Sequence, residues 1–121
     1  LKDGHPYRRV ISVGRYAYQK GYDMLLDAWK IVEERHPDWR LDIYGSLDGG
    51  NNEYEQLKHQ INILDLQTVS LHPATSDIYS SYLKSDIYVS SSRFESFGLV
   101  LVEAMACSLP IVGFRSQYGP A

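Results

Sequence analysis

Two basic residues flank a short loop near the start of the chain. Arg15 and Lys20 stand five positions apart, in a stretch that opens with Gly14 and closes with Gly21. An arginine can grip two phosphate oxygens through its planar guanidinium group, and a lysine adds a mobile point charge. A glycine lets a ligand approach the backbone closely. The pattern therefore suits a diphosphate, and a solvated loop with two surface charges is the alternative that the spacing leaves open.

A pair of glutamates marks a second candidate site. Glu103 is the only charged residue in the apolar stretch 98–107, and Glu95 precedes it by eight positions. A carboxylate on such an apolar helix is costly unless it is hydrogen-bonded or paired. The two hydroxyls of a ribose would satisfy Glu103, and Glu95 would accept hydrogen bonds from a second polyol. The alternative pairs Glu103 with an internal arginine or lysine and leaves Glu95 on the surface.

Strands and helices must position these residues. Strands are predicted where short apolar runs end at glycine or proline, and helices where apolar residues recur at i, i+3, i+4 and i+7. Pro37 ends the first long helix, because the residue before a proline is pushed out of the α conformation. The predicted strands cover residues 8–13, 40–44, 69–72, 86–90 and 110–114, and the predicted helices cover residues 22–36, 54–64, 76–85 and 98–107.

This alternation specifies an α/β fold, a Rossmann-like three-layer domain with a mostly parallel sheet. Ligands of such sheets bind outside the carboxyl ends of the strands. Gly14 and Arg15 follow the first strand, Gly45 follows the second, and residues 90–95 follow the fourth. The unusual residues thus collect at the edge where a ligand binds. Residues 1–121 are predicted to form a single domain, and the thin cover of the last strand suggests a fragment of a longer protein.

The composition excludes several classes of function. With 44% apolar residues and a net charge of −3, the chain is neither disordered nor strongly basic, so nucleic acid is not an expected partner. No apolar run approaches the ~20 residues that span a bilayer. The single cysteine excludes a disulfide scaffold, and the four histidines lack the spacing of metal ligands. We expect a cytoplasmic domain that binds no metal.

Taken together, the two candidate sites resemble the motifs of the family 4 glycosyltransferases. The Arg…Lys loop is similar to one family motif, and Glu95 to Glu103 resembles the family's Glu-x7-Glu element. The spacers agree as well, so the resemblance covers residues 8–119. Members of this family are retaining enzymes of the GT-B type, in which two Rossmann-like domains face each other across a cleft.

The resemblance implies that this chain is the C-terminal, donor-nucleotide half of a GT-B fold. Arg15 and Lys20 would hold the diphosphate of a nucleotide sugar, Glu95 would touch the transferred sugar, and Glu103 would take the ribose hydroxyls. Backbone N–H groups near Phe97 would approach the sugar and the phosphates. The implied catalytic residues are Arg15, Lys20 and Glu95, and the implied donor-binding residues are Gly14, Arg15, Lys20, Glu95, Phe97, Gly98, Leu99 and Glu103.

The resemblance also implies the reaction. A sugar would move from a nucleotide-diphosphate sugar to an acceptor hydroxyl with retention, in polysaccharide, lipopolysaccharide or glycolipid synthesis. No metal or other cofactor is implied. The N-terminal acceptor domain and the closing C-terminal segment are missing from these 121 residues, so we expect the isolated chain to be inactive. Peripheral attachment of the full-length protein to the inner face of a membrane would fit a lipid-linked acceptor.

Two departures leave the nucleotide base undetermined. His72-Pro73 stands where the family often has glycine, and Pro73 lacks an N–H that could contact the base. The turn that begins at Gly45 also differs from the usual short glycine-rich turn. Two alternative functions remain at this point. One is a non-catalytic nucleotide-binding or structural module of the same fold, and the other is a different GT-B enzyme, such as a sugar-nucleotide epimerase.

Overall fold

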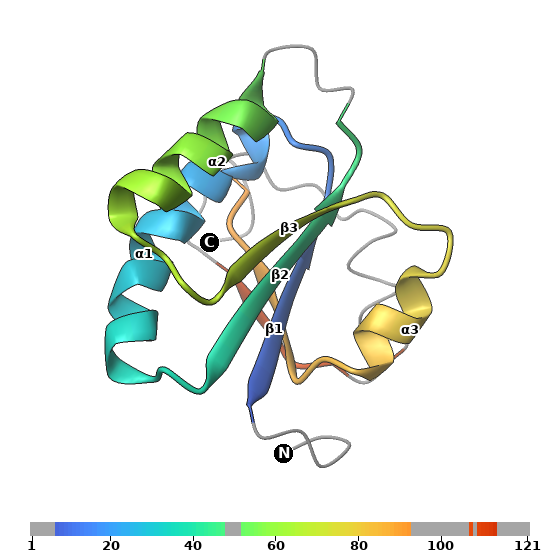
Figure 1. Ribbon diagram of the computed structural model, residues 1–121. Helices are drawn as coiled ribbons and strands as arrows, with labels where there is room; N and C mark the ends of the chain where they lie inside the picture. The colour runs from blue at the N-terminus through green and yellow to red at the C-terminus, as the bar shows by residue number, and fades with distance from the viewer. Residues whose placement is uncertain (1–6, 48–51, 93–106, 108, 114–121) are drawn as a thin grey trace.

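The computed structural model describes residues 7–47, 52–92, 107 and 109–113. Strands and helices alternate along these residues, as the sequence predicts (Figure 1). A short 3-10 helix, η2 (Tyr18–Lys20), precedes the first α-helix. The strands are β1 (Arg8–Val13), β2 (Trp39–Gly45), β3 (Val69–Pro73), β4 (Ile87–Ser90) and β5 (Ile111–Gly113), and the α-helices are α1 (Tyr22–Arg35), α2 (Glu53–Leu64) and α3 (Ile78–Leu83).

The strands form one sheet in the order β3-β2-β1-β4-β5, and every neighbouring pair is parallel. The chain runs from β1 outward to β3, then returns across β1 to β4 and β5. The direction of strand order therefore reverses at β1, which is the place where α/β sheets bind ligands. Helices α1 and α2 lie on one face of the sheet and α3 lies on the other (Figure 1). The predicted α/β class with a parallel sheet is confirmed.

The face under α1 and α2 carries the larger core. Along β2, Leu41 and Ile43 are fully buried while their neighbours are partly exposed, which is the alternation of a strand with two unlike faces. They pack with Leu26 and Trp29 of α1 and with Leu57 of α2. Burying one such side chain contributes about 1.5–3 kcal/mol. This cluster holds β1 and β2 against α1 and α2, and so fixes where the carboxyl ends of the two strands lie.

A second, smaller core lies on the opposite face of the sheet. Ile11 of β1 and Tyr88 of β4 pack there against Tyr82 of α3 and Leu109. Cys107 packs beside them and is only partly exposed.

A carboxylate on α1 ties this helix to the loop before β3. One Glu33 oxygen accepts hydrogen bonds from the N–H groups of Gln67 (2.9 Å) and Thr68 (2.8 Å), and from the Thr68 hydroxyl (2.5 Å). The indole N–H of Trp29 donates to the same hydroxyl at 2.8 Å. The side chains of α1 thus satisfy backbone donors that the sheet leaves unpaired.

Some element boundaries differ from the prediction. Helix α1 ends at Arg35, just before Pro37, as expected. Helix α3 is shorter than the predicted span 76–85, because residues before it form a turn. In that turn the Asp77 N–H donates to the Thr75 hydroxyl at 3.2 Å, and the Ser80 hydroxyl donates to the Asp77 carboxylate at 2.7 Å. Such side-chain bonds compete with the first turn of a helix.

Candidate functional site

A hollow of about 220 Å³ lies at the carboxyl edge of the sheet. Three segments build it: the end of β1, the end of β2, and the stretch from β3 into α3. Its position outside the strand ends matches the general rule for ligands of parallel α/β sheets. The lining residues are Val13, Gly14, Arg15, Tyr44, Gly45, Ser46, Ala74, Thr75 and Ile78.

Both predicted cations lie at this edge. Arg15 is exposed and lines the hollow. The aliphatic part of the half-buried Lys20 side chain packs over Gly14. A Cβ at Gly14 would lie 2.7 Å from Lys20 Cε. Among the described residues, no acidic side chain pairs with either cation. The structure therefore brings Gly14, Arg15 and Lys20 together, with both positive charges available to an anion.

The loop between β1 and α1 is anchored on β4. Gly21 adopts the left-handed conformation, with φ of 66°, and a Cβ there would lie 2.0 Å from the carbonyl oxygen of Ser91. The Ser91 hydroxyl donates to the carbonyl oxygen of Lys20 at 2.8 Å. Only glycine permits so close an approach at positive φ. The backbone of Lys20 is thereby held next to the end of β4.

Two buried tyrosines fix the other end of this loop. Tyr16, directly after Arg15, points its hydroxyl at the carbonyl oxygens of Ile43 (2.9 Å) and His72 (2.6 Å), to which its single proton can donate. The Tyr22 hydroxyl donates to the carbonyl oxygen of Gly14 at 3.0 Å. Burial raises the pKa of both phenols well above the usual value. Both side chains therefore stay neutral. Their hydrogen bonds hold the backbone of the loop that carries Arg15 and Lys20.

The first two strand ends touch each other. A Cβ at Gly45 would lie 1.9 Å from the carbonyl oxygen of Gly14. The Gly14 N–H donates to the carbonyl oxygen of Tyr44 at 2.9 Å, and the Tyr16 N–H donates to that of Ser46 at 3.2 Å. This contact brings the backbone of Gly45 and Ser46 into the same hollow as Arg15.

An aromatic pair stands beside the hollow. The ring of Tyr44, which lines it, stacks on the ring of His72 with centroids 4.3 Å apart and planes 13° apart. Nε2 of His72 lies 2.8 Å from the Asp42 carboxylate. The sequence singles out neither contact, because Tyr44 becomes the register partner of His72, and Asp42 its diagonal neighbour, only once β2 and β3 are aligned.

The remaining predicted site residues, Glu95, Phe97, Gly98, Leu99 and Glu103, lie outside the described residues. Sequence reasoning places Tyr16 and Ser91 at the ligand-binding edge, Tyr16 as a tyrosine that could line a site and Ser91 within residues 90–95, but it misses the support that their hydroxyls give. Their hydroxyls bond to carbonyl oxygens that are 27 to 71 positions away in the chain. The available signals were their positions, directly after Arg15 for Tyr16 and at the end of the fourth predicted strand for Ser91.

Metal and membrane features are absent from the described part of the chain. It contains no group of three or more His, Cys, Asp or Glu side chains placed to hold a metal ion. None of its helices has the length and apolar character that a membrane crossing requires. The positive charge of this site therefore comes, within the described residues, from Arg15 and Lys20.

Comparison with known proteins identifies the family to which this architecture corresponds. The family model described as glycosyl transferases group 1 matches residues 3–121. An uncharacterized glycosyltransferase of Haemophilus influenzae is 39% identical over 113 residues, which cover 93% of this chain and 31% of that protein. Mannosylfructose-phosphate synthase of Agrobacterium fabrum is 37% identical over 113 residues, which cover 85% of this chain and 24% of that enzyme.

A solved structure agrees in fold. The pneumococcal O-GlcNAc transferase GtfA, in complex with UDP and GlcNAc, superposes with a TM-score of 0.80 at 31% identity. The superposition covers 98% of this chain and 23% of GtfA. The chain thus spans less than a third of the length of each of these three proteins.

Proposed function

The chain belongs to the group 1 glycosyl transferases, and from this premise we propose that it is the donor-binding domain of a longer, retaining glycosyltransferase. Its small share of the relatives' length, 31% and 23%, supports this view, because the rest of those proteins leaves room for a second domain. The expected partner is the N-terminal acceptor domain of the GT-B type, and this chain would be the C-terminal half.

The observation that carries the proposal is the pair of available cations at the hollow. Arg15 lines it, and Lys20 reaches over Gly14 toward the same edge. A diphosphate placed there would meet a guanidinium fork and an ammonium group, which together form charge-assisted hydrogen bonds to phosphate oxygens. The UDP complex of the pneumococcal relative supports a nucleoside diphosphate as the ligand class.

The glutamates complete the proposed donor site. Glu95 would orient the transferred sugar, and Glu103 would accept hydrogen bonds from the ribose hydroxyls. Backbone N–H groups of Phe97, Gly98 and Leu99 would approach the sugar and the phosphates. These roles rest on the motif itself.

The proposed chemistry is a transfer with retention. The bond between the anomeric carbon and the diphosphate oxygen breaks, and a bond to the acceptor oxygen forms on the same face of the sugar. The proton of the acceptor hydroxyl passes to the departing diphosphate. Negative charge develops on the departing diphosphate. Fixed cations in a preorganised site stabilise that charge in the transition state. Arg15 and Lys20 would supply this stabilisation without a metal ion, and the isolated chain would bind donor without transferring sugar.

The biological setting follows as part of the same proposal. Sugar acceptors in polysaccharide, lipopolysaccharide or glycolipid synthesis would present a hydroxyl to the second domain. We propose a cytoplasmic enzyme, with peripheral contact at the inner face of the membrane when the acceptor is a lipid.

A titration followed by amide chemical shifts tests the donor site. UDP, GDP and ADP are each added to the labelled chain and to an Arg15→Ala, Glu103→Ala double variant. We expect one diphosphate to bind preferentially and saturably, to shift the amides of Gly14, Ser46 and Thr75, and to lose affinity in the variant. The matched control Arg35→Ala removes an exposed cation at the far end of α1. Shifts elsewhere, or equal binding by the double variant, would refute the donor site.

A further inference from the structure

A second hollow, of about 150 Å³, lies between the sheet and α3. Along β2, Asp42 and Tyr44 alternate with the buried residues that pack under α1 and α2, so their side chains stand on the opposite face of the sheet. We call this space the polar hollow. It is formed by Arg9, Asp42 and Tyr44 from the sheet, and by Ser80, Lys84 and Ser85 from α3 and the residues directly after it.

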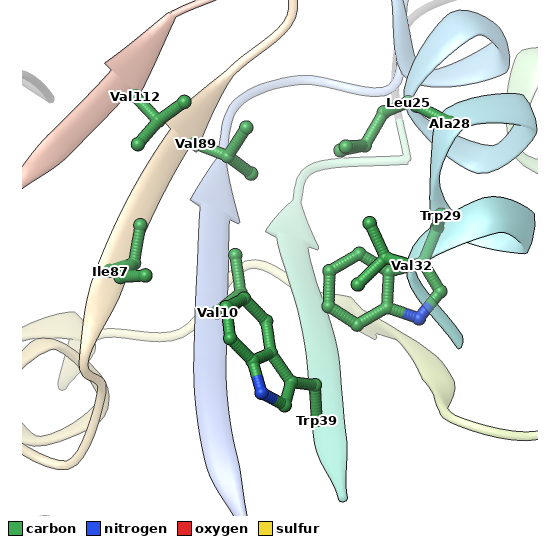
Figure 2. A pocket seen from close by; sticks show the side chains of 9 residues that line it. All are labelled: Val10, Leu25, Ala28, Trp29, Val32, Trp39, Ile87, Val89 and Val112. Carbon is green, nitrogen blue, oxygen red and sulfur yellow. The ribbon is translucent and has the colours of Figure 1, made fainter. Parts of the chain in front are cut away.

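The lining of the polar hollow differs in kind from that of the groove on the α1 face. Aliphatic side chains and two indoles line that groove, as Figure 2 shows. Charged groups, hydroxyls and a phenol line the polar hollow. Because polar groups lose free energy when they are buried without partners, a ligand of the polar hollow must bring hydrogen-bonding groups of its own.

Two serines offer the polar hollow acceptors. The Ser80 hydroxyl donates its proton to the Asp77 carboxylate at 2.7 Å, and the Ser85 hydroxyl donates its proton to the carbonyl oxygen of Ser81 at 2.7 Å. A hydroxyl has one proton and two lone pairs. With their protons already donated, both serine oxygens face a ligand as acceptors.

Charged groups of both signs add further donors and an acceptor. The Arg9 guanidinium donates to the Tyr7 hydroxyl at 2.8 Å and lies 5.2 Å from the centroid of the Tyr7 ring, which holds it in place. Lys84 is exposed and brings an ammonium group with three N–H donors. The Asp42 carboxylate has one oxygen 2.8 Å from Nε2 of His72 and a second oxygen that also accepts. The polar hollow therefore both gives and takes hydrogen bonds.

We propose that the polar hollow binds one neutral hexose ring, as a second carbohydrate site apart from the donor site. A sugar hydroxyl both donates and accepts, so it can give its proton to Asp42 and take a hydrogen bond from Lys84 or Arg9. A phosphate group is mainly an acceptor, and Asp42 would repel it. The small volume suits a single ring, because pockets for drug-sized ligands have about 300–1,000 Å³.

Tyr44 connects this site to the donor site. It lines the polar hollow and also the hollow at the carboxyl edge, so the two spaces share one wall. Its aromatic ring gives the apolar C–H groups of a pyranose a surface to contact. A hexose in the polar hollow would thus lie next to the proposed nucleotide site. The inference goes beyond the proposed function and does not rest on it, because its own lining residues carry it.

Amide chemical shifts test the proposal. Glucose, galactose, mannose and N-acetylglucosamine are titrated into the labelled chain to tens of millimolar, with and without saturating UDP. We expect at least one hexose to shift the amides of Ser81, Lys84 and Ser85 saturably, and to do so equally well when UDP is present. Methyl glycosides of that hexose separate two sources that both support the site: equal binding indicates a unit of a saccharide chain, and lost binding indicates the free sugar.

Variants of the lining residues supply the comparison. Asp42→Ala and Lys84→Ala should each weaken hexose binding about tenfold, because each removes a hydrogen bond to a charged group. The matched control Lys58→Ala, an exposed lysine of α2 on the other face of the sheet, should bind the hexose as the original chain does. If Asp42→Ala fails to fold, the exposed Lys84→Ala still decides the outcome.

Three results would overturn the proposal. The first is that no hexose shifts the amides of Ser81 and Ser85. The second is that UDP abolishes the shifts, which would place the sugar in the donor site. The third is that inorganic phosphate shifts these amides and the hexoses do not, which would indicate an anion site. The amides of Gly14 and Ser46 report UDP binding in the same spectra, so a failure of the proposed function is seen separately.

Discussion

At the scale of single residues, the space above Gly14 decides whether Lys20 can reach the hollow. An alanine Cβ at position 14 would lie 2.7 Å from Lys20 Cε, the far end of a flexible side chain. We predict that Gly14→Ala displaces the ammonium group and weakens UDP binding about tenfold, while the free energy of unfolding changes by less than about 1 kcal/mol. Calorimetric titration and urea unfolding measure the two quantities. A folded variant with undiminished affinity would contradict the role given to Lys20.

A side chain added at Gly45 would meet the backbone of Gly14, whereas one added at Gly14 would meet the flexible side chain of Lys20. A Cβ at Gly45 would lie 1.9 Å from the Gly14 carbonyl oxygen, so the ends of β1 and β2 would have to separate. We predict that Gly45→Ala lowers the free energy of unfolding by about 2–3 kcal/mol. Gly113→Ala is the matched control, because a methyl group there would lie 4.0 Å from its nearest neighbour, the Ser90 carbonyl oxygen. Urea unfolding curves that coincide for the two variants would show that the strand ends are not in contact.

The buried phenol of Tyr22 predicts how stability depends on pH. Its pKa in the folded chain is raised above the usual 10.0, chiefly by burial. Above pH 10 the unfolded chain releases this proton while the folded chain keeps it, so stability is full below pH 10 and falls as pH rises. We predict a shallower fall in Tyr22→Phe, by up to about 1.4 kcal/mol per pH unit. Tyr18→Phe, at an exposed position, should retain the original slope in urea unfolding between pH 8 and 11.

At the scale of elements, the link between α1 and the loop before β3 depends on one carboxylate. Glu33 accepts from two N–H groups and a hydroxyl, whereas its exposed neighbour Glu34 pairs, within the described residues, with Lys30 alone at 3.8 Å. We predict that Glu33→Ala costs about 2 kcal/mol of unfolding free energy and that Glu34→Ala costs less than about 0.5 kcal/mol. Thermal and urea unfolding compare them. Equal losses would mean that the loop is held by packing alone.

Local chemistry explains why the elements were predictable and their contacts were not. Pro37 ends α1 through sterics within the chain, and the apolar periodicity of residues 25–32 is readable in a single stretch. The hydroxyl of Tyr16, by contrast, bonds to strands that are 27 and 56 positions away. The same holds for the Tyr44–His72 stack, which exists only after β2 and β3 are in register. Contacts of this kind follow from topology, which the pattern of one segment does not contain.

At the scale of the whole molecule, the alternation of strands and helices predicted an α/β fold with a parallel sheet, and the structure confirms it. The same reasoning placed Gly14, Arg15 and Lys20 at one edge, where the structure brings them together. The roles of Glu95 and Glu103 remain predictions from the motif. The thin cover that the sequence suggests for the last strand stays a prediction as well.

The central claim is that Arg15 and Lys20 hold a diphosphate at the carboxyl edge of the sheet. The most direct test compares the dissociation constants of UDP and UMP in the original chain and in the Arg15→Ala, Lys20→Ala double variant. Charge-assisted hydrogen bonds to the second phosphate should make UDP bind at least about tenfold tighter than UMP. We predict that the double variant loses this preference while its affinity for UMP stays the same. An unchanged preference for UDP in the variant would contradict the account.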